Sequence, residues 1–239
     1  MRVCRPNPAL SLMIVAVALG GCSAPSAPPL PAPAAAPVVS AQVTKALDLY
    51  RTLLQQQSWE SAAAVGQDIV NRYPTSVAAN EVRRTLPDAS AKATALTTQR
   101  RLQALWLYQS GKESGGNQST ASLYSNDSAT ADRVRLILRR HSAWGSSAYL
   151  YDSGKGFECR GTCTLKLRID AQPEQRIKAY LPPTGEPALF ISDEKAFIAK
   201  LEHAQKISID VVGKDRGTRT LVFEVGGYEP AKFLPLPKK

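Results

Sequence analysis

The sequence predicts an α+β fold, with a helical hairpin segment over residues 41–101 and a mainly antiparallel β-sandwich or open barrel, interrupted by one late helix, over residues 102–239. Two periodicities carry this prediction. Up to about Arg101, apolar residues recur three and four positions apart, which is typical of amphipathic helices. From Leu102 onward they alternate with polar residues, which is typical of half-buried strands. With 44% apolar residues among 239, the chain can bury a substantial core.

The first 21 residues have the organisation of a bacterial export signal. Arg2 and Arg5 precede an apolar run from Ala9 to Leu19. This run is too short to span a membrane but has the length of the apolar stretch of a secretory signal. We therefore exclude residues 1–21 from the fold.

The end of this signal carries a second feature. The segment Leu19-Gly20-Gly21-Cys22 resembles the lipobox of bacterial lipoproteins. The resemblance implies that Cys22 is acylated, becomes the first residue of the mature chain and anchors it to a membrane. Ser23 follows, which in the family's sorting pattern implies the outer membrane, with the protein on its periplasmic face. The alternative is an ordinary cleaved signal peptide whose site happens to contain a cysteine.

Residues 22–40 predict a tether between the anchor and the folded part. Six prolines lie among alanines and serines in this stretch, which contains no charged residue. Such a composition has neither a helical nor a strand period and favours a semi-extended chain.

Four helices are predicted within the segment 41–101. Ser58 is placed to cap the second helix, and Pro74 and Pro87 are expected to end the second and third. The predicted helices are Ala41 to about Gln57, Trp59 to Tyr73, Thr75 to Leu86 and Ala89 to Arg101.

The stretch from Leu47 to Leu86 contains a tight turn at Gln57-Ser58-Trp59 and the segment Asn71-Arg72-Tyr73-Pro74-Thr75-Ser76. It resembles one tetratricopeptide-type hairpin plus the first helix of a next unit. A helical hairpin with no repeat ancestry is the alternative. A single repeat cannot bury its own apolar face, so the resemblance implies packing on the following domain, a partner or a second copy. The candidate partner-binding residues are Tyr50, Trp59 and Tyr73.

Ten short strands and one helix are predicted beyond residue 101, separated by turn residues such as those of the segment Gly111 to Gln118. The helix is expected at Asp193 to Ala204, where Phe197, Ile198 and Leu201 form an apolar stripe. The predicted strands are Leu102–Gln109, Thr120–Ser125, Arg133–Arg140, Ser146–Tyr151, Gly156–Arg160, Cys163–Asp170, Arg176–Leu181, Ala188–Ile191, Lys206–Val212 and Thr218–Val225.

The order of these features resembles the periplasmic accessory lipoproteins associated with type VI secretion. The residues that carry the resemblance are the strand Val134–Leu138, the strand Ala188–Ile191, the helix around Phe197 to Leu201 and the closing strand Val222–Tyr228. The resemblance implies an accessory role in a secretion system, and no functional residue follows from it.

Two cysteines remain in the exported part, because Cys4 leaves with the signal and Cys22 takes the lipid. Cys159 and Cys163 are then expected to form a disulfide in an oxidising compartment. The sequence around Gly161 predicts a hairpin with a three-residue loop that places the two sulfurs opposite each other. The alternative is half of a metal site or a redox dithiol, although no second Cys or His pair accompanies the two.

The formal charge of +10 favours an anionic partner. Alternation places basic residues of three predicted strands, with Tyr180 among them, on outward faces. If the strands are neighbours, they form one basic surface that could bind peptidoglycan, lipopolysaccharide or an acidic protein. The alternative is an ordinary solvated face on which Lys and Arg discourage edge pairing. The candidate anion-binding residues are Arg133, Arg135, Arg139, Lys166, Arg168, Arg176 and Lys178.

No motif predicts an enzyme. Ser192 and Lys195 have the S-x-x-K spacing of penicillin-recognising enzymes but lack the companion motifs, and Ser192 is expected to cap the late helix. His141 and His203 are isolated. The glycines of Asp152–Gly156 are expected to form a hairpin turn rather than a phosphate loop. We expect no cofactor, no metal and, because of export, no nucleic acid as partner.

These observations together predict a non-catalytic interaction or assembly module of the cell envelope, held to the outer membrane by its N-terminal lipid. Its expected partner is an envelope protein. The alternatives are a binding domain for anionic envelope glycan or lipopolysaccharide, and a secretion-system accessory protein.

Overall fold

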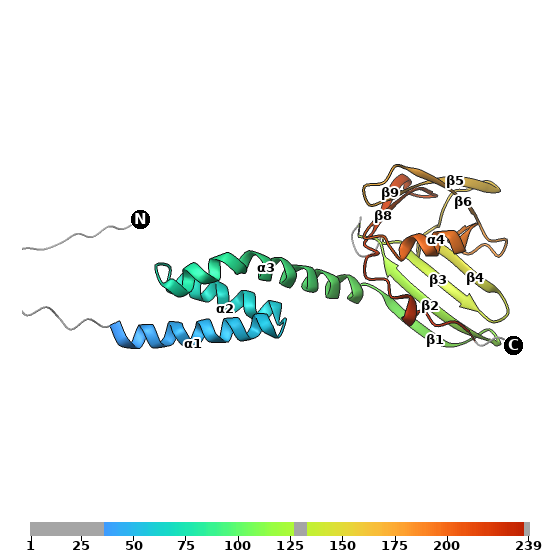
Figure 1. Ribbon diagram of the computed structural model, residues 1–239. Helices are drawn as coiled ribbons and strands as arrows, with labels where there is room; N and C mark the ends of the chain where they lie inside the picture. The colour runs from blue at the N-terminus through green and yellow to red at the C-terminus, as the bar shows by residue number, and fades with distance from the viewer. Residues whose placement is uncertain (1–35, 127–132, 237–239) are drawn as a thin grey trace, which may run out of the picture. The chain divides into compact units, whose positions relative to one another are not determined.

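The computed structural model describes residues 36–126 and 133–236 (Figure 1). The predicted export signal, Cys22 and the first part of the predicted tether lie outside the described residues. Helix α1 (Ala36–Gln55) begins inside the segment that was predicted as tether. Its start is compatible with Pro37, because a proline in the first helical turn removes an N–H that has no partner within the helix.

Three helices pack around a small apolar core. α1 is followed by α2 (Trp59–Arg72) and α3 (Val77–Ala104). Tyr50 is buried between them, and its hydroxyl lies 2.8 Å from Thr85 Oγ1. Gly66 is required at the centre, because a Cβ there would lie 2.8 Å from the Tyr50 ring and 2.9 Å from Leu86 Cδ1. The buried members of this core are Leu47, Tyr50, Ala62, Ile69, Ala78, Ala79, Val82 and Leu86.

The third and fourth predicted helices are one helix, so the expected break at Pro87 was wrong. Pro87 lies inside α3 on an exposed face. The helix continues because buried residues on both sides of the proline, Leu86 and Ala89, hold the same face of α3 inward. Glu60 of α2 also bonds to Thr97 and Arg100 in the later part of α3. Tertiary contacts therefore outweigh the backbone hydrogen bond that a proline removes.

A nine-stranded, open, antiparallel sheet follows, which confirms the predicted α+β fold class. Its strand order is β1-β2-β3-β4-β7-β6-β5-β8-β9. The strands are β1 (Leu107–Glu113), β2 (Gly116–Tyr124), β3 (Arg135–His141), β4 (Gly145–Tyr151), β5 (Thr162–Ile169), β6 (Gln175–Tyr180), β7 (Ala188–Ile191), β8 (Ile207–Gly213) and β9 (Gly217–Phe223).

Two of the predicted boundaries were wrong at the start of the sheet. The strand expected from Leu102 begins at Leu107, because Leu102 is buried in the last turn of α3. The segment expected as a turn from Gly111 to Gln118 is mostly strand. β1 and β2 are joined by Ser114 and Gly115 alone, both with positive φ (43° and 77°), which is the conformation of a two-residue hairpin loop.

The strand predicted at Gly156–Arg160 is also absent, because only Phe157 forms an isolated bridge, to Gly213. The disulfide between Cys159 and Cys163 is confirmed, with Cα atoms 5.5 Å apart. The hairpin expected around it was wrong, since Cys163 belongs to β5 and pairs with Ala179 of β6. The disulfide therefore ties the loop before β5 to that strand.

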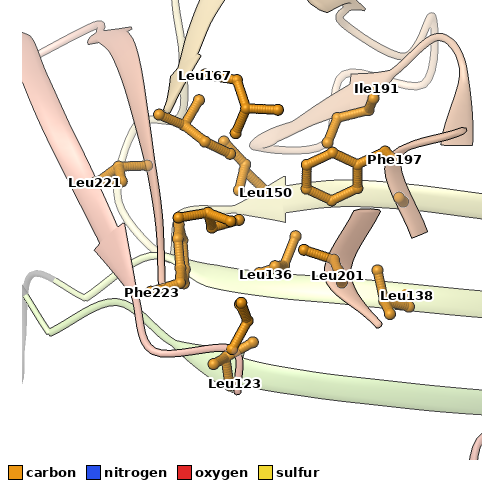
Figure 2. Close-up of a cluster of buried hydrophobic side chains, with 14 of the residues drawn as sticks. Leu123, Leu136, Leu138, Leu150, Leu167, Ile191, Phe197, Leu201, Leu221 and Phe223 are labelled. Atoms are coloured by element: carbon orange, nitrogen blue, oxygen red, sulfur yellow. The ribbon is translucent and has the colours of Figure 1, made fainter. Parts of the chain in front are cut away.

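The core of the sheet domain lies on one face of the sheet, beneath α4 (Glu194–Leu201). Figure 2 shows Leu136, Leu138 and Leu150 from the central strands pointing toward Phe197 and Leu201 of this helix. Ser192 was expected to cap α4, but the cap is the next residue, Asp193, whose Oδ1 accepts the Ala196 N–H at 3.1 Å.

No helix in the described part of the chain combines the length and the apolar character that a membrane span requires.

Candidate functional site

The outward face of the sheet carries a continuous group of aromatic and arginine side chains. The register places Tyr124 of β2, Arg135 of β3 and Tyr151 of β4 in one cross-strand row. Since side chains alternate along a strand, the residues two positions away share this face. We call this group the arginine-aromatic face; it comprises Tyr124, Arg135, Arg139, Trp144, Tyr149, Tyr151, Tyr180 and Phe190.

Three of its rings form a ladder across β4, β7 and β6. The Tyr149 and Phe190 ring centroids lie 4.7 Å apart with planes inclined by 18°. The Phe190 and Tyr180 centroids lie 5.7 Å apart with planes inclined by 28°. In this stack, the Phe190 ring lies between the other two and covers part of one face of each. Burial raises the pKa of the Tyr149 phenol, and the nearby Arg139 and Arg135 oppose this rise only in part.

The two arginines of β3 lie over aromatic rings. The Arg135 guanidinium is 5.6 Å from the Tyr124 ring centroid and donates to Ser122 Oγ at 2.8 Å. The Arg139 guanidinium is 5.1 Å from the Trp144 centroid and 5.3 Å from that of Tyr149. No carboxylate within residues 36–126 and 133–236 forms an ion pair with either arginine. Within the described residues, both guanidinium groups are thus held in place by rings and hydroxyls and have no carboxylate partner.

Much of this surface is open to solvent. Tyr124 is 56% exposed and Trp144 is 52% exposed, and Tyr151 and Tyr180 are also among the exposed large side chains. Scattered single apolar residues are normal on a protein surface, but contiguous aromatic ones mark an interaction site.

His141, one of the two histidines predicted to be isolated, supports this face. Its ring is 2% exposed and stacks on Trp144 with centroids 3.8 Å apart. Nδ1 accepts the backbone N–H groups of Ala143 and Trp144, so Nε2 carries the proton and donates to the Glu113 carbonyl at 2.9 Å. His141 therefore shapes the turn between β3 and β4 that presents Trp144. His203 is exposed just beyond α4.

The basic residues predicted to form one surface fall into two groups. β4 and β7 lie between β3, which carries Arg135 and Arg139, and β6, which carries Arg176 and Lys178. The premise that all three strands are neighbours was therefore wrong, and only β5 and β6 are adjacent. Sequence periodicity gives the face of each residue but not the order of strands. Arg133 is exposed just before β3.

Acidic neighbours compensate part of the positive charge that the basic residues of β5 and β6 carry. Arg168 forms ion pairs with Asp210 and Glu174, both at 3.1 Å, and Lys166 lies 3.9 Å from Glu174. Burial would raise the pKa of Asp210, but hydrogen bonds from Thr220 and Arg168 outweigh it and hold that pKa below its usual range. Lys178 donates to Thr164 at 2.8 Å. This patch therefore presents less net charge than its sequence suggests.

The aromatic residues predicted to bind a partner lie in the helical part. Tyr50 is 1% exposed and belongs to the core, so its side chain is not accessible to a partner. Trp59 is half-buried, with Lys92 Nζ 4.1 Å from its ring centroid, and Tyr73 is half-buried at the end of α2. These three residues do not form one exposed surface.

Two further motifs have structural explanations. Asp152 is buried; its Oδ1 accepts the Gly154 N–H, and its Oδ2 pairs with Arg219 at 3.3 Å, as expected of a turn. Ser192 precedes the capping residue Asp193. Across the described ranges, no three His, Cys, Asp or Glu residues are grouped as metal binding would require.

No protein-family model matches the chain, and no curated protein matches it. Among solved structures, the chain is similar to the invasion associated protein B of Bartonella henselae. The match has a TM-score of 0.37 and 16% sequence identity, and it covers 53% of this chain and 87% of that one.

Proposed function

We propose that this protein is a non-catalytic interaction module of the cell envelope that binds a protein partner through the arginine-aromatic face. The observation that carries the proposal is a contiguous set of Tyr, Trp and Phe rings crossed by two arginines that pair with no carboxylate among the described residues. Tyr, Trp and Arg dominate the energetically important centres of protein interfaces, where Lys, Asp and Glu are depleted.

The chemistry of this face favours a protein over a sugar polymer. A pyranose ring packs on an open aromatic face, and stacking among Tyr149, Phe190 and Tyr180 covers part of the ring faces that a sugar would use. The residues that a polyanionic glycan needs are divided between two parts of the sheet, and Arg168 is already paired with Asp210 and Glu174. An accessory role in a secretion system would be one case of such a module.

The anchoring part of the proposal rests on the sequence alone. The basic residues at the N-terminus, the apolar run after them and the Leu19–Cys22 motif support lipidation at Cys22. Ser23 supports a location at the outer membrane. We propose that the lipid and the tether hold the folded part on the periplasmic face.

The partner is tested by affinity purification of the tagged full chain from cell envelopes, with quantitative mass spectrometry. We expect one stoichiometric protein that is lost in the double variant Arg135→Ala/Arg139→Ala. The matched control is Lys155→Ala/Lys214→Ala, which removes the same charge from two exposed positions away from this face and should retain that protein. Loss in the control alone would contradict the proposal.

The double variant Lys166→Ala/Lys178→Ala, at outward positions of β5 and β6, tests the glycan alternative. Purified sacculi and lipopolysaccharide are incubated with the full chain at low and high salt. The proposal predicts no specific retention of either. Salt-sensitive retention that Lys166→Ala/Lys178→Ala abolishes would instead establish an anion-binding domain, because exposed charge interactions weaken as salt increases.

The anchor is tested by feeding cells an alkyne-tagged fatty acid. The wild-type chain should carry the label and sediment with outer membranes, whereas Cys22→Ala should lose both properties. Outer-membrane sedimentation of an unlabelled wild-type chain would contradict lipidation at this residue.

A further inference from the structure

Strand β6 loses its neighbour halfway along its length. β7 pairs with the second half of β6 through Ala179–Ile191 and Tyr180–Phe190. One more bond follows, from the Ser192 N–H to the Lys178 carbonyl at 2.9 Å. The chain then turns away to form α4, which begins at Glu194. Among the strands of the described residues, none therefore lies beside the first half of β6 on this side.

The register determines which backbone N–H and C=O groups in the first half of β6 point away from β5. Lys178 directs its carbonyl toward β7, and in an antiparallel ladder residues two positions apart direct their N–H and C=O groups to the same side. Arg176 therefore directs both its N–H and its C=O into the space beside β6. Its neighbours Gln175 and Ile177 direct theirs to β5, where they pair with Leu167 and Leu165.

This open edge forms one wall of a groove whose other wall is α4. The cavity has a volume of about 380 Å³, within the range of ligand sites. Ile177, Ile191 and Phe197 make it apolar, and Arg176, Lys178 and Lys200 place three cations around it. The carboxylate of Asp193, the acidic residue of the lining, is engaged with the Ala196 N–H.

We propose that this groove binds an acidic, extended segment of a partner protein, which adds to β6 as a short strand. Edge strands bind extended peptides through main-chain hydrogen bonds, while pockets select alternate side chains. The available edge, Gln175 to Lys178, accommodates about four peptide residues. The excess of cations selects a segment that carries carboxylates.

The pleat of the sheet gives the expected pattern of that segment. Side chains of an added strand that point to the inner face meet Ile177 of β6 and Phe197 of α4, so they should be apolar. Those that point to the outer face lie beside Arg176 and Lys178, so they should be acidic. The groove thus favours alternating apolar and acidic residues, and it is a site separate from the arginine-aromatic face.

The test uses the full chain and a dye-labelled hexapeptide of alternating valine and glutamate, with binding followed by fluorescence anisotropy. We expect saturable binding that Ala196→Phe weakens by at least about tenfold, because the new ring fills the groove. Ala199→Phe is the matched control, since Ala199 is also exposed on α4 but does not line this groove. Lys200→Glu should weaken binding and Lys195→Glu should change it less.

A second readout locates the peptide. Amide hydrogen exchange should slow at Arg176 and Lys178 on addition of the hexapeptide and stay unchanged at Ile177, whose amide already faces β5. The proposal is overturned by absence of binding up to about 1 mM peptide, by equal binding of a valine-lysine hexapeptide, or by equal effects of Ala196→Phe and its control. Protection of the Arg176 amide in the free chain would also overturn it, because the edge would already be covered.

Discussion

At the scale of single residues, the buried ring of His141 connects the ends of β1 and β3 to the exposed ring of Trp144. It donates to the Glu113 carbonyl, accepts from two backbone N–H groups and stacks on Trp144. The arrangement explains a histidine at the end of a strand without assigning it any catalytic role.

We expect His141→Ala to lower the free energy of unfolding by about 1–3 kcal/mol, because it removes three partly buried hydrogen bonds to the backbone together with the stack on Trp144. Urea denaturation measures this change. His203→Ala is the control, since His203 is exposed and should leave the free energy of unfolding within about 0.5 kcal/mol of wild type. Equal effects of the two variants would contradict the structural role of His141.

The disulfide makes a limited contribution to the stability of the fold, because it closes a loop with a sequence separation of only 4. Removing it with Cys159→Ser/Cys163→Ser should lower the free energy of unfolding by about 2 kcal/mol, the chain-entropy value for so short a loop. The variant should keep the wild-type far-ultraviolet circular dichroism spectrum. Loss of the folded sheet on this double substitution would contradict the account.

At the scale of elements, α3 continues through Pro87 because its neighbours on both sides pack inward. Pro87→Ala should therefore stabilise the chain by up to about 3 kcal/mol, since it restores a donor within an existing helix. Thermal unfolding followed at 222 nm measures the shift. A lower Tm would show that the helical core requires the proline.

The end of α3 is joined to the sheet domain by an ion pair with a pH dependence. Arg101 donates two hydrogen bonds to Glu224, at 2.9 and 2.7 Å, and these hold the pKa of Glu224 below its usual value. A carboxylate with a lowered pKa stabilises the fold above its ordinary pKa of about 4.3, and this contribution is lost as pH falls through the folded-state value.

Glu224→Gln should thus be less stable than wild type at pH 6, and the difference should shrink as pH falls from about 5 to about 3. Urea denaturation at a series of pH values measures it. Glu158→Gln, at an exposed position, serves as control and should follow the wild-type curve. A constant difference between Glu224→Gln and wild type would contradict the role of this ion pair.

Most elements follow from local pattern, and the errors occur where distant contacts decide. The strand Ala188–Ile191 was predicted to the residue because its apolar run is bounded by turn signals. Pro87 and the boundary at Leu102 were mispredicted because packing on α2 and on the sheet domain determines where α3 ends. The hairpin loop at Ser114-Gly115 was missed because the glycine-rich segment around it was taken as one long turn.

At the scale of the whole molecule, the candidate site depends on strand order, which periodicity does not encode. Alternation assigned Arg135 and Arg139 correctly to an outward face. Alternation did not predict that Phe190 lies beside Tyr149 and Tyr180, because this contact depends on the position of β7 between β4 and β6. The aromatic character of the site was missed for the same reason, although Tyr149 and Tyr151 already showed outward spacing.

The central claim is that the arginine-aromatic face contacts a protein partner in the envelope. Site-specific photo-crosslinking in whole cells tests it most directly, with a benzophenone amino acid placed singly at Tyr124, Tyr151 or Val77. Val77 is the control because it is 84% exposed but lies at the start of α3. We predict one discrete crosslinked protein from positions 124 and 151, lost when Arg139→Ala is added, and none from position 77. A crosslink from position 77 alone, or none from positions 124 and 151, would contradict the claim.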